Sequence, residues 1–347
     1  MTRVNELADT KIDERIAKIK EDMKGDVFIP VHHYQKDEIV QFADCTGDSL
    51  ELSRVSAQTP ARFIVFCGVY FMAEIARTLA SDDKYVFIPD PSAGCPLADF
   101  AFHQDVEYVW EILSDLHPGG YVPVTYANSH IDVKAFCGRN GGLICTSSNV
   151  QKIFTWILNQ GKRIFFMPDM NLGLNTAAAL GMADECCVVN RYDQDTLHLV
   201  QGRIVLWKGF CIVHKRFTLE QVRRWRERDE EIRIIVHPEC DPEVVDAADY
   251  NGSTSKIKST VEQSPAGSKW VIGTEYNLVH RLKQNNPDKF VEPLSRSVCE
   301  NMSKNSRRDL LATLLALQKG DFSRQVVVSE EVREDARRAI MRMLDLS

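Results

Sequence analysis

The chain has 347 residues, of which 44% are hydrophobic and 26% are charged. This balance is that of an ordinary globular protein, and it excludes a disordered chain, a collagen-like fibre and a coiled coil. The formal net charge of −7 argues against a general attraction to nucleic acid or anionic lipid. At roughly 150 residues per domain, the length predicts two or three domains.

The first residues of the chain, 1–25, favour a helical segment over an export signal. They contain 12 charged side chains and no apolar run of the kind that a signal sequence needs. The most apolar stretch, residues 63–73, is well short of the ~20 residues that cross a bilayer. We therefore expect a cytoplasmic protein with no membrane partner and no nucleic-acid partner.

Short apolar runs rich in β-branched residues alternate with segments of helical periodicity. In the segment 69–80, for example, Phe71, Ile75 and Leu79 fall on one helical face. Near-continuous apolar strands alternating with helices are typical of parallel sheets covered on both faces, so we predict an α/β fold. The predicted strands are 27–31, 61–66, 85–89, 121–125, 142–145, 163–167, 203–207, 232–236 and 269–272.

A degenerate repeat suggests three similar αβα units. In each unit a strand ends in polar residues, at 31–34, 124–128 and 236–240. Units of this size fit the length, and ligands of open α/β sheets bind beyond the carboxyl ends of the strands. We expect small parallel sheets around a pseudo-threefold axis, with the active site at the centre. The predicted divisions are an N-terminal helical segment 1–25, αβα domains 26–117, 118–207 and 208–292, and a C-terminal segment 293–347 with a docking helix at 329–345.

Three hydroxyl-bearing turns, at 47–49, 146–149 and 252–254, each precede a predicted helix. The N–H groups and positive dipole end of a helix N-terminus suit phosphate or carboxylate, and a hydroxyl adds a donor. For any one turn, ordinary N-capping is the simpler explanation. Three such turns, one in each unit, favour a shared anion site.

The polar residues at the strand ends have side chains suited to proton transfer. Taken singly, each is equally well explained as a polar residue that caps a sheet; together they predict an active site. Residues that can donate or accept protons are Tyr34, Tyr126, His237 and Glu239, and residues that can hold a carbonyl oxygen are His32 and Asn128.

The ten cysteines include no C-x-x-C pair, so no local zinc or ferredoxin-type signature is present. In a reducing compartment they are packed thiols, catalytic thiols or metal ligands, and any metal site must be assembled from distant parts of the chain. Cys67 lies inside an apolar run and is expected to be a small buried hydrophobic residue.

Eleven segments between about residues 28 and 305 match one family in order. They are 32–35, 47–54, 65–74, 93–99, 126–129, 145–149, 167–173, 207–214, 237–240, 252–255 and 273–275. With these segments the sequence resembles quinolinate synthase, the iron–sulfur enzyme family of de novo NAD biosynthesis. Two parts of the chain depart from the pattern. Lys304 follows the last cysteine at an unusual spacing, and the stretch 174–202, with Cys186 and Cys187, resembles only longer members.

The resemblance implies a [4Fe–4S] cluster held by Cys95, Cys211 and Cys299. Three thiolates leave one iron without a protein ligand, and such an iron is an open Lewis-acid site. Implied partners are the Fe–S assembly machinery and, because iminoaspartate hydrolyses quickly, an L-aspartate oxidase.

The implied reaction condenses iminoaspartate with dihydroxyacetone phosphate to give quinolinate, phosphate and two waters. The residues that would face the phosphate are Ser49, Ser147, Ser253 and Thr254. Tyr34 and Glu239 would handle proton transfers, and His32 and His237 would hold substrate oxygens. Tyr126 and Asn128 would orient the carbonyl carbons.

Two other functions remain open at this point. One is an Fe–S or thiol-based redox sensor on an α/β scaffold, which would use the ten cysteines to report redox state. The other is a cluster-free hydrolase in which Cys240 or Cys211 acts as nucleophile with a histidine base. Iron and sulfide analysis separates both from the first reading.

Overall fold

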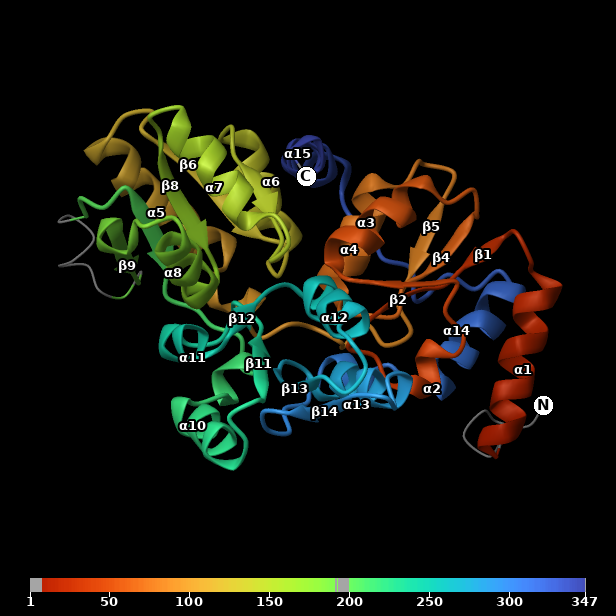
Figure 1. Cartoon of the computed structure of the whole chain (residues 1–347). Helices are drawn as coiled ribbons and strands as arrows, with labels where there is room; N and C mark the ends of the chain where they lie inside the picture. Colours follow the sequence, from red (N-terminus) through yellow and green to blue (C-terminus); the bar gives the residue numbers. More distant parts are fainter. Residues whose placement is uncertain (1–7, 191, 193–199, 347) are drawn as a thin grey trace. The chain divides into compact units, whose positions relative to one another are not determined.

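The computed structural model describes residues 8–190, 192 and 200–346. They fall into two compact units: unit 1 is Met1–Cys95 with Val298–Val328, and unit 2 is Pro96–Ser297 with Ser329–Ser347. Each unit is built from two separate stretches of the chain. The colours of Figure 1 run along the sequence from red at the N-terminus to blue at the C-terminus. In the described residues every pairing between named strands is parallel, so the predicted α/β fold class is confirmed.

Unit 1 holds two small sheets. The strands β1 (Val27–Phe28), β4 (Phe63–Val65) and β5 (Tyr85–Phe87) lie in the order β1-β4-β5. The second sheet pairs β2 (Pro30–His32) with β3 (Cys45–Gly47). The helices of this unit are α1 (Asp9–Asp22), α2 (Asp37–Val40), α3 (Ser49–Gln58), α4 (Tyr70–Leu79), the 3-10 turn η5 (Met302–Lys304) and α14 (Arg307–Gln318).

Helices α1 and α14 share one apolar core although they come from opposite ends of the chain. Ile12, Ile16 and Ile19 recur at helical spacing and are buried in a cluster with Leu310 and Leu314 of α14. The cluster also contains the inward side chains of β4 and β5. The N-terminal half of unit 1 therefore depends on the C-terminal stretch to cover its core.

Unit 2 holds a sheet with the order β7-β6-β8-β10-β9 and a second with the order β12-β11-β13-β14. The first contains β6 (Tyr121–Tyr126), β7 (Leu143–Cys145), β8 (Arg163–Met167), β9 (Cys186–Val189) and β10 (Ile204–Trp207). The second contains β11 (Arg233–Val236), β12 (Tyr250–Asn251), β13 (Lys269–Gly273) and β14 (Phe290–Pro293). Strands β6, β8, β10 and β13 are almost wholly buried, as parallel strands covered on both faces must be.

Helices and 3-10 turns connect these strands. They are η2 (Ala98–Phe100), α5 (His103–Leu116), α6 (Ile131–Arg139), α7 (Val150–Asn159), α8 (Met170–Ala179), η3 (Ala183–Glu185), η4 (His214–Arg216), α10 (Leu219–Arg228), α11 (Pro242–Ala247), α12 (Thr254–Gln263), α13 (Tyr276–Asn285) and α15 (Glu330–Asp345). No helix in the part of the chain that the structure describes is long and apolar enough to cross a membrane.

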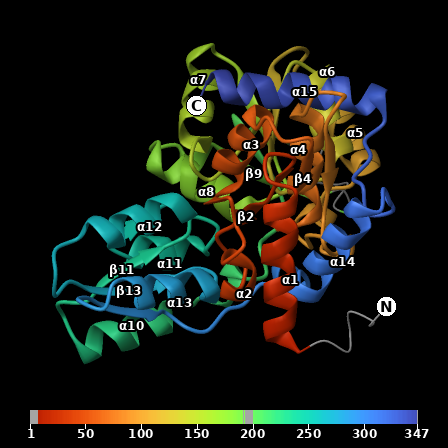
Figure 2. The same ribbon diagram turned by 90° about the vertical axis from the view of Figure 1, so that its right-hand side faces the viewer.

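The predicted docking helix is α15, which lies along α6 within unit 2 (Figure 2). The two helices come close at Gly138, where an added Cβ would lie 1.9 Å from the carbonyl oxygen of Asp335. Next to it, the guanidinium of Arg139 donates to the Asp335 carboxylate at 3.0 Å. Because Gly138 has no side chain, the backbones of α6 and α15 can approach each other at this position.

All nine predicted strands are present, the first of them split into β1 and β2. The predicted helix at 69–80 is α4. Thr218 and Gln221 form a capping box at the start of α10. Strands β3, β9, β12 and β14 were not predicted. The division into three domains and the pseudo-threefold arrangement stay predictions.

Candidate active site and metal-binding cysteines

The loop that follows β11 places His237 and Glu239 in the interior of unit 2, each 2% exposed. The backbone N–H of His237 donates to the carbonyl of Gly273 at the end of the neighbouring strand β13. The Nδ1 atom of His237 accepts the N–H of Glu239 at 3.3 Å, so its ring proton is on Nε2. Burial, and then the charge of His214, lowers the pKa of His237 to about 3. His237 is therefore a neutral Nε2–H donor at pH 7.

Unit 1 repeats this geometry at His32, which is 4% exposed at the end of β2. Its backbone N–H donates to the carbonyl of Cys67, beside the end of β4, at 3.0 Å. Its Nδ1 atom accepts the N–H of Tyr34 at 3.1 Å, which again leaves the ring proton on Nε2. The ring of Tyr34 lies edge-on to His32, with centroids 4.8 Å apart. Both predicted histidines thus share one local construction, a histidine that accepts the N–H two residues later.

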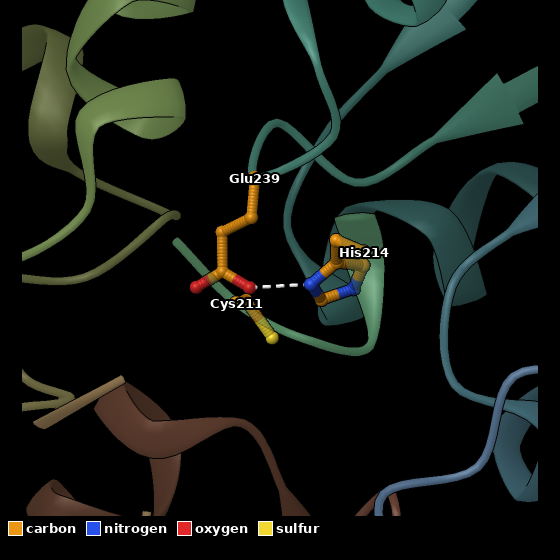
Figure 3. A group of neighbouring side chains, drawn as sticks. All are labelled: Cys211, His214 and Glu239. Atoms are coloured by element: carbon orange, nitrogen blue, oxygen red, sulfur yellow. Dashed lines mark ion pairs between the residues drawn. The ribbon is translucent and has the colours of Figure 1, made fainter. Parts of the chain in front are cut away.

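Glu239 is surrounded by groups that stabilise its charge. The Nδ1 atom of His214 lies 2.5 Å from its Oε2 atom (Figure 3). Burial raises the pKa of Glu239, but the electrostatic interaction with His214 and hydrogen bonding from His214 and Tyr126 outweigh it and lower the pKa to about 2. Its Oε1 atom is buried without a hydrogen-bond partner among the described residues. Glu239 is therefore ionised at pH 7, and one of its oxygens has no hydrogen-bond partner among the described residues.

The N-terminus of α8 brings a second carboxyl group to this region. Asp169 caps the helix, with Oδ1 accepting the N–H of Leu172 at 2.8 Å, and it also accepts a backbone hydrogen bond from Cys211. Complete burial and the nearby charge of Glu239 hold the pKa of Asp169 well above its usual value. The electrostatics of the pair therefore favour the charged form at Glu239 over the charged form at Asp169.

The predicted residue Tyr126 is the last residue of strand β6, and Asn128 lies on the turn that follows it. Tyr126 is 6% exposed and hydrogen-bonds to Glu239, so the structure brings these two predicted residues together. Ser129 ties the turn by donating from Oγ to the carbonyl of Tyr126 at 2.8 Å. The ammonium of the buried Lys134 donates to the carbonyl of Ser129. Asn128 is half-buried on the same turn.

The hydroxyl-bearing turns differ in how they cap their helices. Asp48, not Ser49, caps α3 through a capping box with Glu51. Asn149 is the N-cap residue of α7 but makes no side-chain cap bond. Ser253 does cap α12, accepting the N–H of Lys256 at 3.3 Å.

Two of these turns lie on one cavity of unit 2. Ser147 and Ser253 both line a space of about 260 Å³, together with Asn175 and Lys256. Thr254, which follows the N-cap, is buried at 4% exposure. Among the described residues, the hydroxyls of Ser49 and Ser147 make no hydrogen bond that caps a helix.

The cysteines divide by burial. Burial raises the pKa of the buried thiols Cys67, Cys137, Cys145 and Cys240 well above the usual value, so they stay protonated. This agrees with the expectation of a packed thiol at Cys67. The predicted ligands Cys95, Cys211 and Cys299 are all partly exposed.

The segments that carry the predicted ligands are held by hydrogen bonds. In unit 1, Lys304, five residues after Cys299, donates from Nζ to the carbonyl of Ser92 in the loop that carries Cys95, at 2.7 Å. In unit 2, the backbone N–H of Cys211 donates to Asp169. Partly exposed thiols are donors of the type that an iron–sulfur cluster takes, so the chemistry of these residues suits such a group, and their ligation of one cluster stays a prediction.

Cys211, His214 and Glu239 also form a group whose ligand atoms lie within 4.8 Å of one another and could hold a metal ion. His214 is the first residue of η4, three residues after Cys211, and Glu239 comes from the loop after β11 (Figure 3). Within this group the His214 ring and the Glu239 carboxylate form a close ion-pair contact.

Sequence reasoning missed three residues of this region: Asp169, His214 and Thr274. Thr274 contacts His214, with Oγ1 3.2 Å from Nε2. Thr274 directly follows the buried strand β13, and Asp169 lies two residues after the end of the buried strand β8. The rule that polar residues at strand ends form the site would have found both. Nothing in the local sequence signals His214, because its partners come from distant strands.

Comparison with known proteins decides the family. A family model described as "Quinolinate synthetase A protein" matches residues 14–345. The chain belongs to this family. Members from Bacillus subtilis (45% identical over 99% of this chain and 95% of that protein) and Bacillus velezensis (46% over 96% and 93%) are named quinolinate synthase. A member from Geobacillus with the same name is 45% identical over 97% of this chain and 94% of its own length.

The predicted resemblance is thus confirmed, and this member of the quinolinate synthetase A protein family is an enzyme of that kind. A solved structure of the E-1-hydroxy-2-methyl-but-2-enyl-4-diphosphate reductase from Plasmodium falciparum also matches 97% of this chain and 93% of that one. Its sequence identity is 11% and its TM-score is 0.27, which is too low to bear on fold or function.

Proposed function

We propose that this enzyme condenses iminoaspartate with dihydroxyacetone phosphate to give quinolinate, phosphate and two waters. The observation that carries the proposal is the match of nearly the whole chain to relatives named quinolinate synthase. The local geometry of the predicted residues supports it, because it supplies neutral donors, an ionised base and hydroxyls without cap bonds. The same proposal places the enzyme in the cytoplasm, where thiols stay reduced.

The two histidines are proposed to hold substrate oxygens. Both His32 and His237 accept a backbone N–H at Nδ1 and so present Nε2–H to a carbonyl or carboxylate oxygen. A neutral imidazole polarises a carbonyl without giving up its proton. Tyr126 and Asn128 are proposed to orient the carbonyl carbons of the substrates.

Glu239 and Tyr34 are proposed to move protons. The ionised Glu239 would remove a proton from carbon during isomerisation and ring closure, and its Oε1 atom is the oxygen without a partner among the described residues. The phenol of Tyr34 would return a proton to the opposite end of the substrate. The hydroxyls of Ser49, Ser147, Ser253 and Thr254 are proposed to bind the phosphate as donors.

A [4Fe–4S] cluster is proposed at Cys95, Cys211 and Cys299. When bound, it would supply one iron without a protein ligand, which acts as a Lewis acid on a substrate hydroxyl or carboxylate. The fixed loops around Cys95 and Cys211 would keep the thiols in place for it. Loading would require the Fe–S assembly machinery, and an L-aspartate oxidase is proposed as the source of the short-lived iminoaspartate.

The test is an anaerobic assay of the full chain. Protein purified without oxygen should contain about four irons and four sulfides per chain. It should form quinolinate from dihydroxyacetone phosphate and iminoaspartate generated in the cuvette from aspartate. Iron-loaded protein that forms no quinolinate would favour a redox sensor, and iron-free protein with hydrolytic activity would favour a thiol hydrolase.

A further inference from the structure

Helix α8 places two carboxamides against the loop that carries His237 and Glu239. Asn171 and Asn175 lie one helical turn apart, so their side chains project from the same face. They are 1% and 8% exposed. A buried amide needs hydrogen-bond partners, because leaving its donors unpaired is costly.

The two amides bond to successive carbonyls of that loop. The Nδ2 atom of Asn175 donates to the carbonyls of Pro238 and Cys240, both at 2.8 Å. These are the two residues on either side of Glu239. The Nδ2 atom of Asn171 lies 3.4 Å from the carbonyl oxygen of Glu239 itself and 3.0 Å from the Asp241 carboxylate. Three consecutive carbonyls are thus held by one helix face.

The geometry of the loop depends on these bonds. The N–H of Glu239 reaches Nδ1 of His237 only if the intervening peptide units keep their orientation. A carboxamide has two N–H donors in one plane, and Asn175 uses them to fix the peptide units Pro238–Glu239 and Cys240–Asp241. Helix α8 is itself anchored by its N-cap residue, Asp169.

We propose that Asn171 and Asn175 are positioning residues that fix Glu239 and His237 for the reaction. The proposal rests on the proposed function for the role of Glu239, but the fastening of the loop can be measured without it. Asn175 also lines the cavity with Ser147, whereas Asn171 is not among the residues that line it. Variants at the two positions therefore separate loop positioning from direct contact with a ligand in the cavity.

The test combines kinetics with amide hydrogen exchange on the cluster-loaded full chain. Asn175→Leu keeps the size of the side chain and removes both donors. We expect kcat to fall ~10²-fold, the effect of about 1 Å of misplacement in an active site, and the amides of Glu239 and Cys240 to exchange faster. Asn171→Ala should change kcat and exchange in the same direction but leave the KM for dihydroxyacetone phosphate unchanged. Asn175→Gln, which keeps the donors, should recover part of kcat.

Asn286 supplies the matched control. It is also a buried asparagine of unit 2, 6% exposed, and its Nδ2 atom donates to the carbonyl of Leu282 at 2.8 Å within α13. Asn286→Ala should lower the melting temperature and leave kcat and the exchange of the Glu239 amide unchanged.

If the amides of residues 239 and 240 exchange in Asn175→Leu at the same rate as in the wild-type enzyme, the proposal is overturned, whatever happens to kcat. If Asn175→Leu does not fold, the exchange and kcat of Asn171→Ala decide in the same way. If the wild-type enzyme makes no quinolinate, the proposed function fails, and faster exchange in the variants would still support the fastening of the loop.

Discussion

The hydroxyl of Ser147 offers a sharp test of the anion site, because it can be removed without disturbing a helix cap. Ser147 lines the cavity of unit 2, and the N-cap residue of α7 is Asn149. A hydrogen bond from this hydroxyl to a phosphate contributes ~1.5–3 kcal/mol, or ~10- to 100-fold in affinity. Ser147→Ala should therefore raise the KM for dihydroxyacetone phosphate by about that factor. A substitution that breaks no structural bond changes stability by only about 0.5 kcal/mol or less.

Two further variants calibrate this measurement. Ser253→Ala removes both a proposed phosphate donor and the cap bond to Lys256, so it should raise the same KM and also cost ~1 kcal/mol of stability. Thr218→Ala removes the cap of the exposed helix α10 and should lower stability by a similar amount with both KM values unchanged.

The assay is steady-state quinolinate formation with each substrate varied in turn, beside a melting curve for each variant. A stability loss of ~1 kcal/mol corresponds to about 2–4 °C for a unit of this size. If Ser147→Ala melts like Thr218→Ala and leaves the KM for dihydroxyacetone phosphate unchanged, the turn is a structural element and the anion site lies elsewhere. An equal rise in the KM for iminoaspartate would also contradict the reasoning, because other residues are proposed to bind the carboxylates of iminoaspartate.

The remaining predictions address the cluster, proton transfer and packing. Cys95→Ser, Cys211→Ser and Cys299→Ser should each abolish brown colour and activity, whereas Cys67→Ser and Cys186→Ser should keep iron; a coloured, active Cys299→Ser protein would refute the ligand assignment. Tyr34→Phe and Glu239→Gln should each lower kcat by ~10²–10⁴ with an unchanged cluster spectrum, and near wild-type rates in both would place the chemistry on other residues. Gly138→Ala, whose Cβ would lie 1.9 Å from the carbonyl oxygen of Asp335, should lower the melting temperature by forcing α15 away from α6; an unchanged melting curve would show that this contact is dispensable.

The buried strands could be predicted from the sequence because their apolar runs are continuous. Of the strands that were not predicted, β12 and β14 lack this signal. Both residues of β12, Tyr250 and Asn251, are exposed, and β14 ends in Pro293. Each lies at the edge of its sheet, where one side of the backbone has no partner strand and polar residues and proline are tolerated. An alternating or apolar pattern is therefore weakest at the edges.

The site could be predicted in part for a similar reason. His237 and Glu239 follow an apolar strand, so their position at a strand end could be inferred from the residues before them. Asn171 and Asn175 lie inside a helix. Asparagine is uncommon there, but the surrounding sequence does not indicate which residue its side chain bonds to. Their bonds join residues more than 60 positions apart, and no local pattern encodes such a pairing.

The two-part composition of unit 1 has a consequence for synthesis on the ribosome. The core of α1, β4 and β5 is covered by α14, which is translated only after all of Pro96–Ser297. At ~5–20 residues per second, about 10–40 s pass before α14 is synthesised and can cover the apolar faces of α1 and β4. During that interval the sequence Pro96–Ser297 can already form its own sheets, while the first segment has an incomplete core and depends on chaperones for protection. A nascent chain that stalls before Arg307 would carry a largely formed second unit attached to an N-terminal segment open to proteolysis.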